Sequence, residues 1–330
     1  MQWNHHIRYS VMVLLRFVLL VASIAVITFL LAYLAPVNPV DAFLGQQSVT
    51  SDEQRALIAR EWGLDKAPLA RFLLWMKGIF SGDWGTSYLY QRPVLEIISA
   101  GFRNSALLMM SAWIFSGVLG VLLGIVAAAN EGGAADKMIK TLCYVFSATP
   151  AFWVGILFLL VFSVALGIFP IGLSAPVGMS ADEAGIIEKM HHAFLPSLTL
   201  SITGISHITM YTRESMCRIL RSDFALFSRA RGCSKAQIIV RHGLRNMLLP
   251  VITVQCSSIN EIFGGSVLVE SVFTYAGLGS VTVSAGVNGD MPLLMGITII
   301  SAAIVFFGNA LANLLYPLAD PRIESRKVNN

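Results

Sequence analysis

Residues 223–250 read DFALFSRARGCSKAQIIVRHGLRNMLLP, a basic and polar stretch between two apolar segments of the chain. Its only acid is Asp223, and its basic residues and histidine are Arg229, Arg231, Lys235, Arg241, His242 and Arg245. Because Lys and Arg resist translocation, a basic loop between two spans is expected on the cytoplasmic side. Gly232 divides the stretch into two short helices, and Ser234 can cap the second. Charge alone would also fit an ordinary connecting loop.

The composition indicates a polytopic membrane protein. The chain has 330 residues, of which 55% are hydrophobic and only 13% are charged, whereas about 25% are charged in soluble domains. No nucleic-acid-binding signature is present. The cysteines stand singly, which indicates reduced packing residues rather than a disulfide framework. The first apolar run is too long for a cleavable signal peptide and lacks a small-residue cleavage site.

Six apolar runs are long enough to cross a bilayer, so we expect an all-α membrane protein with six transmembrane helices. The spans lie at residues 11–34, 106–129, 142–168, 194–210, 248–269 and 293–315. Basic residues beside the ends of the chain place both termini in the cytoplasm. Pro150 should kink the third span, and the glycines at 117, 120 and 124 should let another helix approach the second.

These spans divide the chain into three segments. Residues 1–35 form the cytoplasmic N-terminus and the first span, and residues 36–104 form an extracytoplasmic amphipathic segment with balanced charge. Residues 105–330 form a five-span core, with a loop at 217–249 between the fourth and fifth spans and a cytoplasmic tail. In the second segment, Thr50–Glu53 provide the capping residues of a helix that runs to Trp62, and turn residues alone explain a folded spacer without substrate contact.

The order of motifs resembles permease subunits of the dipeptide, oligopeptide and nickel branch of ABC importers. That branch carries D-Y-V-x-x-A-R-A-K-G and then H-x-L-R-N-x3-P in a long cytoplasmic loop, the EAA motif region. The resemblance implies that this loop docks into a groove of a separate ATPase and passes its motion to the spans. It assigns this coupling role to Asp223, Arg229, Ala230, Gly232, His242, Arg245 and Asn246.

Two short stretches depart from the family pattern. Leu226, Phe227 and Ser228 replace the usual Arg-Thr-Ala or Glu-Ala-Ala triplet, and Val37-Asn38 replaces Gly-Asp in P-G-D-P. Elsewhere the resemblance extends from Pro36 to Arg322, and includes G-D-x-G-x-S at residues 82–87 and E-x-x-G-G-x4-E-x-x-F at 261–273.

The fourth and fifth spans are the expected substrate path. Hydroxyls inside a bilayer either bridge helices or line a wet route, and the fourth span is the least apolar. The residues predicted to line the path are Ser201, Thr203, His207, Ser257, Asn260 and Glu261. An acid in a span is costly, so Glu261 either faces the path or ties helices together.

Catalytic and cofactor-binding motifs are absent from the sequence. It has no G-x-x-x-x-G-K-[ST], H-E-x-x-H or G-x-S-x-G, so we expect no catalytic residues and no cofactor in this chain. The His5-His6 and His191-His192 pairs lack a further ligand in view, so no metal site is predicted. ATP and Mg²⁺ would be used by partner ATPases.

The resemblance implies a permease of the bacterial inner membrane that imports peptides, or nickel or metal chelates, by alternating access. Its implied partners are a second homologous permease, two ATPase subunits, an extracytoplasmic substrate-binding protein and membrane lipid, with no nucleic acid. Two other classes remain open from the sequence. One is a proton-driven secondary transporter with Glu261 as the carrier. The other is a membrane enzyme or protease, for which no nucleophile and base are recognisable.

Overall fold

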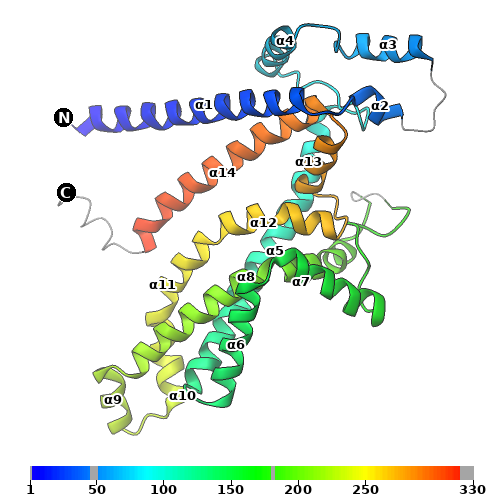
Figure 1. Cartoon of the computed structure of the whole chain (residues 1–330). Helices are drawn as coiled ribbons and strands as arrows, with labels where there is room; N and C mark the ends of the chain where they lie inside the picture. The colour runs from blue at the N-terminus through cyan, green and yellow to red at the C-terminus, as the bar shows by residue number, and fades with distance from the viewer. Residues whose placement is uncertain (1, 45–50, 180–182, 320–330) are drawn as a thin grey trace. The chain divides into compact units, whose positions relative to one another are not determined.

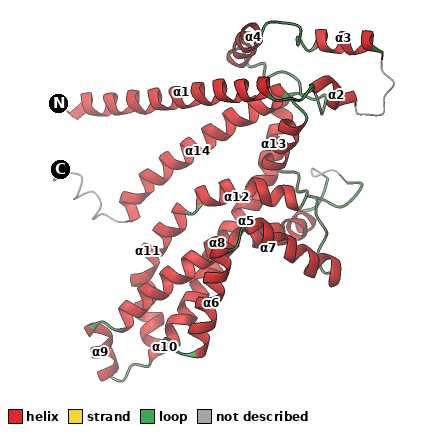
Figure 2. Ribbon diagram, in the orientation of Figure 1, coloured by secondary structure: helices red, strands yellow, loops and turns green. Residues whose placement is uncertain are grey.

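The computed structural model describes residues 2–44, 51–179 and 183–319 (Figure 1). Among these residues the regular structure is helical, and the one β-bridge, Thr86 to Pro93, lies outside any strand (Figure 2). The chain forms two compact units, which are described separately. The first comprises residues up to Arg103 together with Gly277–Gly308, and the second comprises Asn104–Ala276 together with the residues from Asn309 onward.

The first unit contains the N-terminal helices and the start of the last one. Its helices are α1 (Gln2–Leu34), α2 (Pro39–Leu44), α3 (Asp52–Glu61), α4 (Pro68–Phe80), the first turns of α5 (Val94–Ala129), α13 (Leu278–Val287) and α14 (Met291–Ala319) as far as Gly308. Its core brings Val94, Ile98, Leu278 and Leu293 together. The buried carboxylate of Asp290 begins α14 by accepting the N–H of Leu293 at 3.2 Å.

The second unit is built around one long helix, α8 (Ile186–Leu220), which packs on α6 (Ala134–Ala148), α7 (Ala151–Phe158), α11 (Leu244–Ser257) and α12 (Ile259–Val272). A short π-helical segment, Leu159–Ala165, continues α7. Two short helices, α9 (Asp223–Ala230) and α10 (Lys235–Ile238), follow α8, and a second π-helical segment, Ile239–Gly243, leads into α11.

Four helices among the described residues are long and apolar enough to cross a membrane: Val11–Leu34, Val94–Ala129, Ile186–Leu220 and Met291–Gly308. A fifth span results if Ala134–Ala148 and Ala151–Ala165 are one broken segment, bent by 109°. The break falls at Pro150, as predicted. The prediction of an α-helical membrane protein is confirmed, whereas the count of six spans stays a prediction, because the expected fifth span divides at Ser258 into α11 and α12.

Several span boundaries differ from those predicted. The second span was expected to begin at residue 106, but α5 begins at Val94 because the polar residues Arg103 and Asn104 interrupt the hydropathy without interrupting the helix. The fourth span was expected to end at residue 210, yet α8 continues to Leu220. The division of the chain into three segments remains a prediction.

Small residues hold α5 close to α8, as the glycine spacing predicted. A Cβ atom added at Gly124 would lie 2.5 Å from Cβ of Thr212, and one at Gly120 would lie 2.7 Å from Cβ of Ile208. Neither position can hold a larger residue without displacing the neighbouring helix. This close contact fixes one side of α8 and leaves another side exposed.

Candidate functional site

The two short helices after α8 are defined by local sequence signals. Ser222 caps α9 and accepts the N–H of Ala225 at 3.4 Å. Gly232 then has a φ of +84°, a conformation that glycine adopts without a steric penalty. Ser234 begins α10 through a reciprocal capping box with Gln237. The predicted division at Gly232 and the predicted cap at Ser234 are therefore both confirmed. We call residues 221–246 the coupling loop, after the role that the family resemblance implies.

The coupling loop exposes large apolar side chains. Phe224 is 47% exposed, Leu226 55%, Phe227 63% and Val240 66%. Leu226 and Phe227 belong to the stretch that departs from the family triplet. Its third member, Ser228, is buried, and its hydroxyl donates to the carbonyl of Phe224 at 2.9 Å. The atypical stretch thus gives the loop an apolar surface that is available to another protein.

The residues predicted for coupling differ in whether they bond to the loop. Arg229 donates to the carbonyl of Leu220 at 3.2 Å and so satisfies the C-terminal end of α8. Asn246 donates to the carbonyl of His242 at 3.0 Å, and the His242 ring meets Phe224 edge to face with centroids 4.8 Å apart. These three residues stabilise the loop itself. Asp223, Ala230, Gly232 and Arg245 are exposed.

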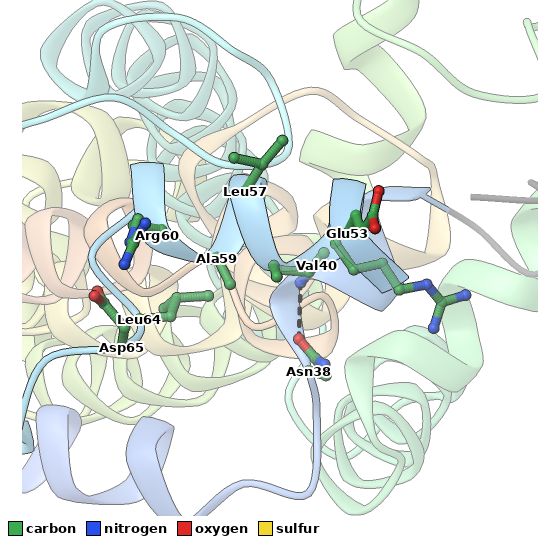
Figure 3. A pocket seen from close by; sticks show the side chains of 10 residues that line it. Asn38, Val40, Glu53, Leu57, Ala59, Arg60, Leu64 and Asp65 are labelled. Carbon is green, nitrogen blue, oxygen red and sulfur yellow. Dashed lines mark hydrogen bonds between the residues drawn. The ribbon is translucent and has the colours of Figure 1, made fainter. Parts of the chain in front are cut away.

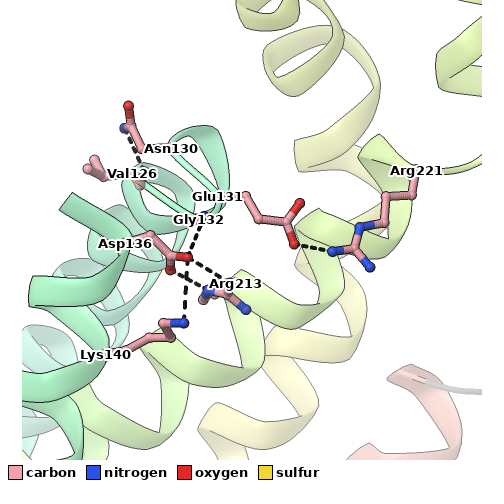
Figure 4. Close-up of polar contacts among 8 residues, drawn as sticks. All are labelled: Val126, Asn130, Glu131, Gly132, Asp136, Lys140, Arg213 and Arg221. Atoms are coloured by element: carbon pink, nitrogen blue, oxygen red, sulfur yellow. Dashed lines mark hydrogen bonds and ion pairs between the residues drawn. The ribbon is translucent and has the colours of Figure 1, made fainter. Parts of the chain in front are cut away.

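A buried ion pair joins α6 to α8 near the coupling loop (Figure 4). Asp136 is fully buried and accepts from Arg213 Nε at 2.5 Å and from another guanidinium nitrogen of Arg213 at 2.8 Å. The same carboxylate accepts the N–H of Gly132 at 2.9 Å, and Lys140 lies 3.7 Å away. No sequence motif predicted this pair, although a charged residue so close to the start of an apolar helix could have indicated it.

Two further contacts fix the turn between α5 and α6. Glu131 accepts from Arg221, the residue that ends α8. Desolvation raises the pKa of Glu131, but the hydrogen bond and charge of Arg221 outweigh it and lower the pKa below its usual range. The ammonium group of Lys235, at the start of α10, donates to the carbonyl of Ala129, the last residue of α5. The coupling loop is therefore bonded directly to the turn between α5 and α6.

The exposed side of α8 is polar where a lipid-facing helix would be apolar. Between residues 195 and 218 its exposed residues are His207, Tyr211, Glu214 and Arg218, and Thr203 is half-buried one turn before His207. These positions follow one another at three- or four-residue spacing and so share one face. Glu214 and Arg218 lie 3.9 Å apart as an ion pair. We call this surface the polar face of α8.

The neighbouring helix α12 exposes a second stripe that includes an acid. Glu261, Gly264, Leu268 and Ser271 are exposed at helical spacing. Ser257 ends α11 and Asn260 lies in α12, but their side chains are outside the described part of the structure. Ser201 is buried, and its hydroxyl donates to Leu198 in its own helix at 2.7 Å, so it does not belong to the exposed face.

The other spans provide the contrast. Within residues 106–129 the exposed side chains of α5 are aliphatic or methionine, from Met110 to Val126, and α7 exposes Phe152, Trp153 and Ile156. The span of α1 is almost entirely exposed and is much more apolar than that of α8. Apolar exposed faces suit lipid, whereas the polar face of α8 suits water or another protein.

A polar contact holds the break between α11 and α12. The indole N–H of Trp113 on α5 donates to the carbonyl of Gln255 at 3.0 Å, and the Gln255 amide donates back to the carbonyl of Trp113 at 2.6 Å. Ser258, at the break, donates its hydroxyl to the same Gln255 carbonyl at 2.8 Å. The break is therefore pinned to α5 by satisfied backbone groups, as required within a membrane.

The first unit contains a large open pocket between α2 and α3, with a volume of about 880 Å³ (Figure 3). Charged residues of both signs line it, among them Glu53, Arg60 and Asp65, together with the apolar Leu57 and Leu64. Asn38, at one wall, accepts the N–H of Val40 at 3.0 Å and so begins α2. Within the described residues no group of three or more His, Cys, Asp or Glu is arranged to hold a metal.

Comparison with known proteins assigns a family to this architecture. The family of binding-protein-dependent transport system inner membrane components matches residues 120–325, and the corresponding N-terminal family matches residues 6–106. The oligopeptide transport system permease protein AppB of Bacillus subtilis is 34% identical over 92% of this chain and 94% of that protein. The dipeptide transport system permease protein DppB of Escherichia coli K12 is 28% identical over 92% of the chain and 95% of its own length.

Proposed function

The chain belongs to the family of binding-protein-dependent transport system inner membrane components, so it is a permease subunit of an ABC importer, and we propose that it carries peptides. Two similar permeases are named for oligopeptide and dipeptide transport, and they match along nearly the whole chain. These relatives give no support to the proton-driven carrier considered from the sequence. Nickel and metal chelates are the alternative substrates that the uptake test below can detect.

The observation that carries a translocation route is the polar face of α8. A row of Thr203, His207, Tyr211 and Glu214 on an otherwise apolar span would be costly against lipid. Glu261 is the exposed acid of α12, the helix that packs on α8. A water-filled path between these helices and a second, similar permease would accommodate such groups. Weak polar contacts along it would let a peptide pass without being held.

The proposed coupling begins at the exposed apolar side chains of the coupling loop. Phe224, Leu226 and Phe227 would sit in a groove of an ATPase subunit, with Arg245 and Asp223 at the rim. Lys235 and Arg221 bond this loop to the turn between α5 and α6, so movement of the loop would reach three helices together. ATP, which would bind more tightly to the closed form of two ATPase subunits, would shift the equilibrium between inward-open and outward-open states.

The proposed orientation places the coupling loop and both termini in the cytoplasm, because basic residues are retained on that side. An extracytoplasmic binding protein would deliver the peptide to the opposite end of the path. In this assembly Mg²⁺ and ATP belong to the ATPase subunits, and this chain contributes binding surfaces and movement rather than catalysis.

Uptake measurements test the proposal. The chain is produced with its partner subunits in cells that lack peptide importers, and the uptake of labelled dipeptides, oligopeptides and nickel is compared. We expect peptide uptake that requires ATP and persists when a protonophore is added. Uptake of nickel without uptake of any peptide would replace the proposed substrate, and uptake abolished by the protonophore at constant ATP would contradict the mechanism.

A further inference from the structure

A small cavity lies within the first unit, between α1, α4 and the start of α14, with a volume of about 170 Å³. The apolar part of its wall includes Phe29 of α1, Trp75 of α4 and Met291 of α14. Two cations, Lys66 and Arg71, also line it, and Tyr88 completes the aromatic wall. This cavity is separate from the polar face of α8 and from the coupling loop, and the proposed function does not use it.

The cavity offers hydrogen-bond donors without matching acceptors. The one hydrogen bond of Arg71 within the described part of the chain goes to the thioether of Met291 at 3.5 Å, a weak acceptor. Lys66 has no ion pair among the described residues. The indole nitrogen of Trp75 is buried and has no hydrogen-bond partner in the described part of the chain. A buried donor without a partner is costly, and a bound oxyanion would satisfy the indole N–H and pair with the half-buried Arg71 and the exposed Lys66.

The buried acid Asp290 does not fill this role. Asp290 lies close enough to Tyr88 for its charge to act on the phenol. The Asp290 carboxylate, however, accepts from Ser87 and from the N–H groups of Leu89 and Leu293, at distances from 2.5 to 3.2 Å. The hydroxyl of Tyr88 donates to the carbonyl of Trp62 at 3.3 Å. The carboxylate of Asp290 is therefore already occupied by other donors, and the side chains of Lys66 and Arg71 remain available to pair with an anion.

The surroundings of the cavity indicate a membrane surface. The Phe29 ring, near the C-terminal end of the α1 span, meets Phe72 of α4 edge to face, with centroids 5.1 Å apart. Away from this contact α4 exposes Leu69, Leu73 and Phe80, and no residue of α4 is buried. A helix with an exposed apolar face and flanking lysines is typical of the water–lipid interface, where tryptophans and tyrosines also gather.

We propose that this cavity binds the phosphate group of an outer-leaflet phospholipid through Lys66, Arg71 and the Trp75 indole N–H. The acyl chains lie against the exposed apolar residues of α1 and α4. The oxyanion chemistry would suit free phosphate equally, but the lipid-exposed surface of α1 continues to the cavity and favours the lipid. The assignment to the outer leaflet rests on the orientation given under the proposed function; the binding site itself does not.

Native mass spectrometry of the purified, delipidated complex tests the proposal. Phosphatidylglycerol, diacylglycerol and inorganic phosphate are titrated separately. We expect phosphatidylglycerol to bind, diacylglycerol to bind at least about tenfold more weakly, and inorganic phosphate not to displace the lipid at similar concentrations, since a charge-assisted hydrogen bond in a desolvated site contributes at least that factor. Displacement by inorganic phosphate would identify a free-anion site and overturn the lipid assignment.

Matched variants on one segment locate the site. Arg71→Gln should weaken phosphatidylglycerol binding at least about tenfold, Arg71→Lys less, and Trp75→Phe severalfold, because the last removes an uncharged N–H donor together with part of the aromatic wall. Lys77→Gln is the control, since Lys77 lies on the same helix but does not line the cavity. Equal binding by all variants would overturn the proposal. Labelling of Ser81→Cys from outside sealed vesicles checks the orientation independently, so an error there is distinguishable from failure of the lipid site.

Discussion

Gly232 is the residue on which the shape of the coupling loop depends. Its φ of +84° costs an ordinary L-residue roughly 1–2 kcal/mol, and no atom stands within 4 Å of the position a Cβ would take, so the constraint is conformational rather than steric. We expect Gly232→Val to reduce transport per ATP hydrolysed by about tenfold or to prevent ATPase association. Transport and ATPase activity are measured together in proteoliposomes.

Gly232→Asn is the matched control for this effect, because Asn tolerates positive φ better than other residues with a side chain. It should keep most of the coupling that the Val variant loses. If the Val variant transports and assembles like the unaltered protein, the hinge role assigned to Gly232 is wrong.

Gly124 depends on space rather than on backbone conformation. A Cβ there would meet Cβ of Thr212 at 2.5 Å and the backbone oxygen of Thr209 at 2.7 Å. Gly124→Ala should therefore destabilise the protein by about 1–3 kcal/mol through overpacking, measured as a lower melting temperature in detergent. Gly286→Ala, in α13 where the space is open, should leave the melting temperature unchanged or raise it. Equal melting temperatures for the two variants would contradict the close packing of α5 on α8.

For single residues, the sequence predicted local caps and turns but not pairs between distant residues. Ser234 and Gly232 act within a few residues of themselves, so capping and turn preferences predicted both. Asp136 and Arg213 are 77 residues apart, and no local preference connects them. Ser201 was wrongly predicted to line the substrate path. Its hydroxyl donates to a carbonyl of its own helix, which the sequence alone does not reveal.

The ion pair between Asp136 and Arg213 is the strongest polar link between elements of the second unit. Removing one partner leaves a buried charge, which typically costs about 3–5 kcal/mol. Asp136→Asn and Arg213→Gln should each lower the melting temperature, and surviving protein should hydrolyse ATP with less transport per turnover, because α6 would no longer move with α8. Lys137→Gln, at an exposed position of α6 next to Asp136, is the control for charge loss.

The charge-swapped double variant, Asp136→Arg with Arg213→Asp, separates pairing from general damage. Partial recovery relative to either single substitution would show that the two charges act on each other. A double variant as poor as the sum of the singles would mean that each residue acts through other neighbours, such as Gly132 and Lys140.

The polar face of α8 makes a prediction about water access. A cysteine at Thr203 or Glu261 should react with a membrane-impermeant thiol reagent in at least one nucleotide state, whereas a cysteine at Val118 on the exposed apolar side of α5 should not. The native cysteines that are half-buried, Cys233 and Cys256, are replaced first. Protection of both test positions in every nucleotide state, in a folded complex, would remove α8 and α12 from the proposed path.

Hydropathy predicted where most helices lie, but not how they end or bend. The apolar runs marked the positions of α1, α5, α8 and α14, since membrane helices need long apolar segments. The start of α5 at Val94 and the end of α8 at Leu220 lie outside the apolar runs, and both residues pack against distant parts of the chain. Pro150 predicted the place of the bend between α6 and α7 but not its angle of 109°.

For the whole molecule, the surface of the coupling loop indicates where the ATPase attaches. Burying the exposed ring of Phe227 would contribute about 1.5–3 kcal/mol, which corresponds to roughly a 10- to 100-fold change in affinity. Phe227→Ala should therefore weaken co-purification of the ATPase, while Phe152→Ala, on the apolar exposed side of α7, should not. Equal recovery of the ATPase from the two variants would place the contact elsewhere.

The orientation of the whole chain determines whether this attachment can occur. In sealed vesicles of known sidedness, protease should cut the coupling loop only from the cytoplasmic side. A cysteine replacing Ala230 or Arg245, both exposed, should cross-link to a cysteine in the groove of the ATPase, whereas one at Ser228, which is buried, should not. Cleavage from the outer side would reverse the predicted topology and separate the loop from any cytoplasmic ATPase. Correct topology without a cross-link at any exposed position of the coupling loop would instead leave it a basic connector, and energy would have to enter the permease through another surface.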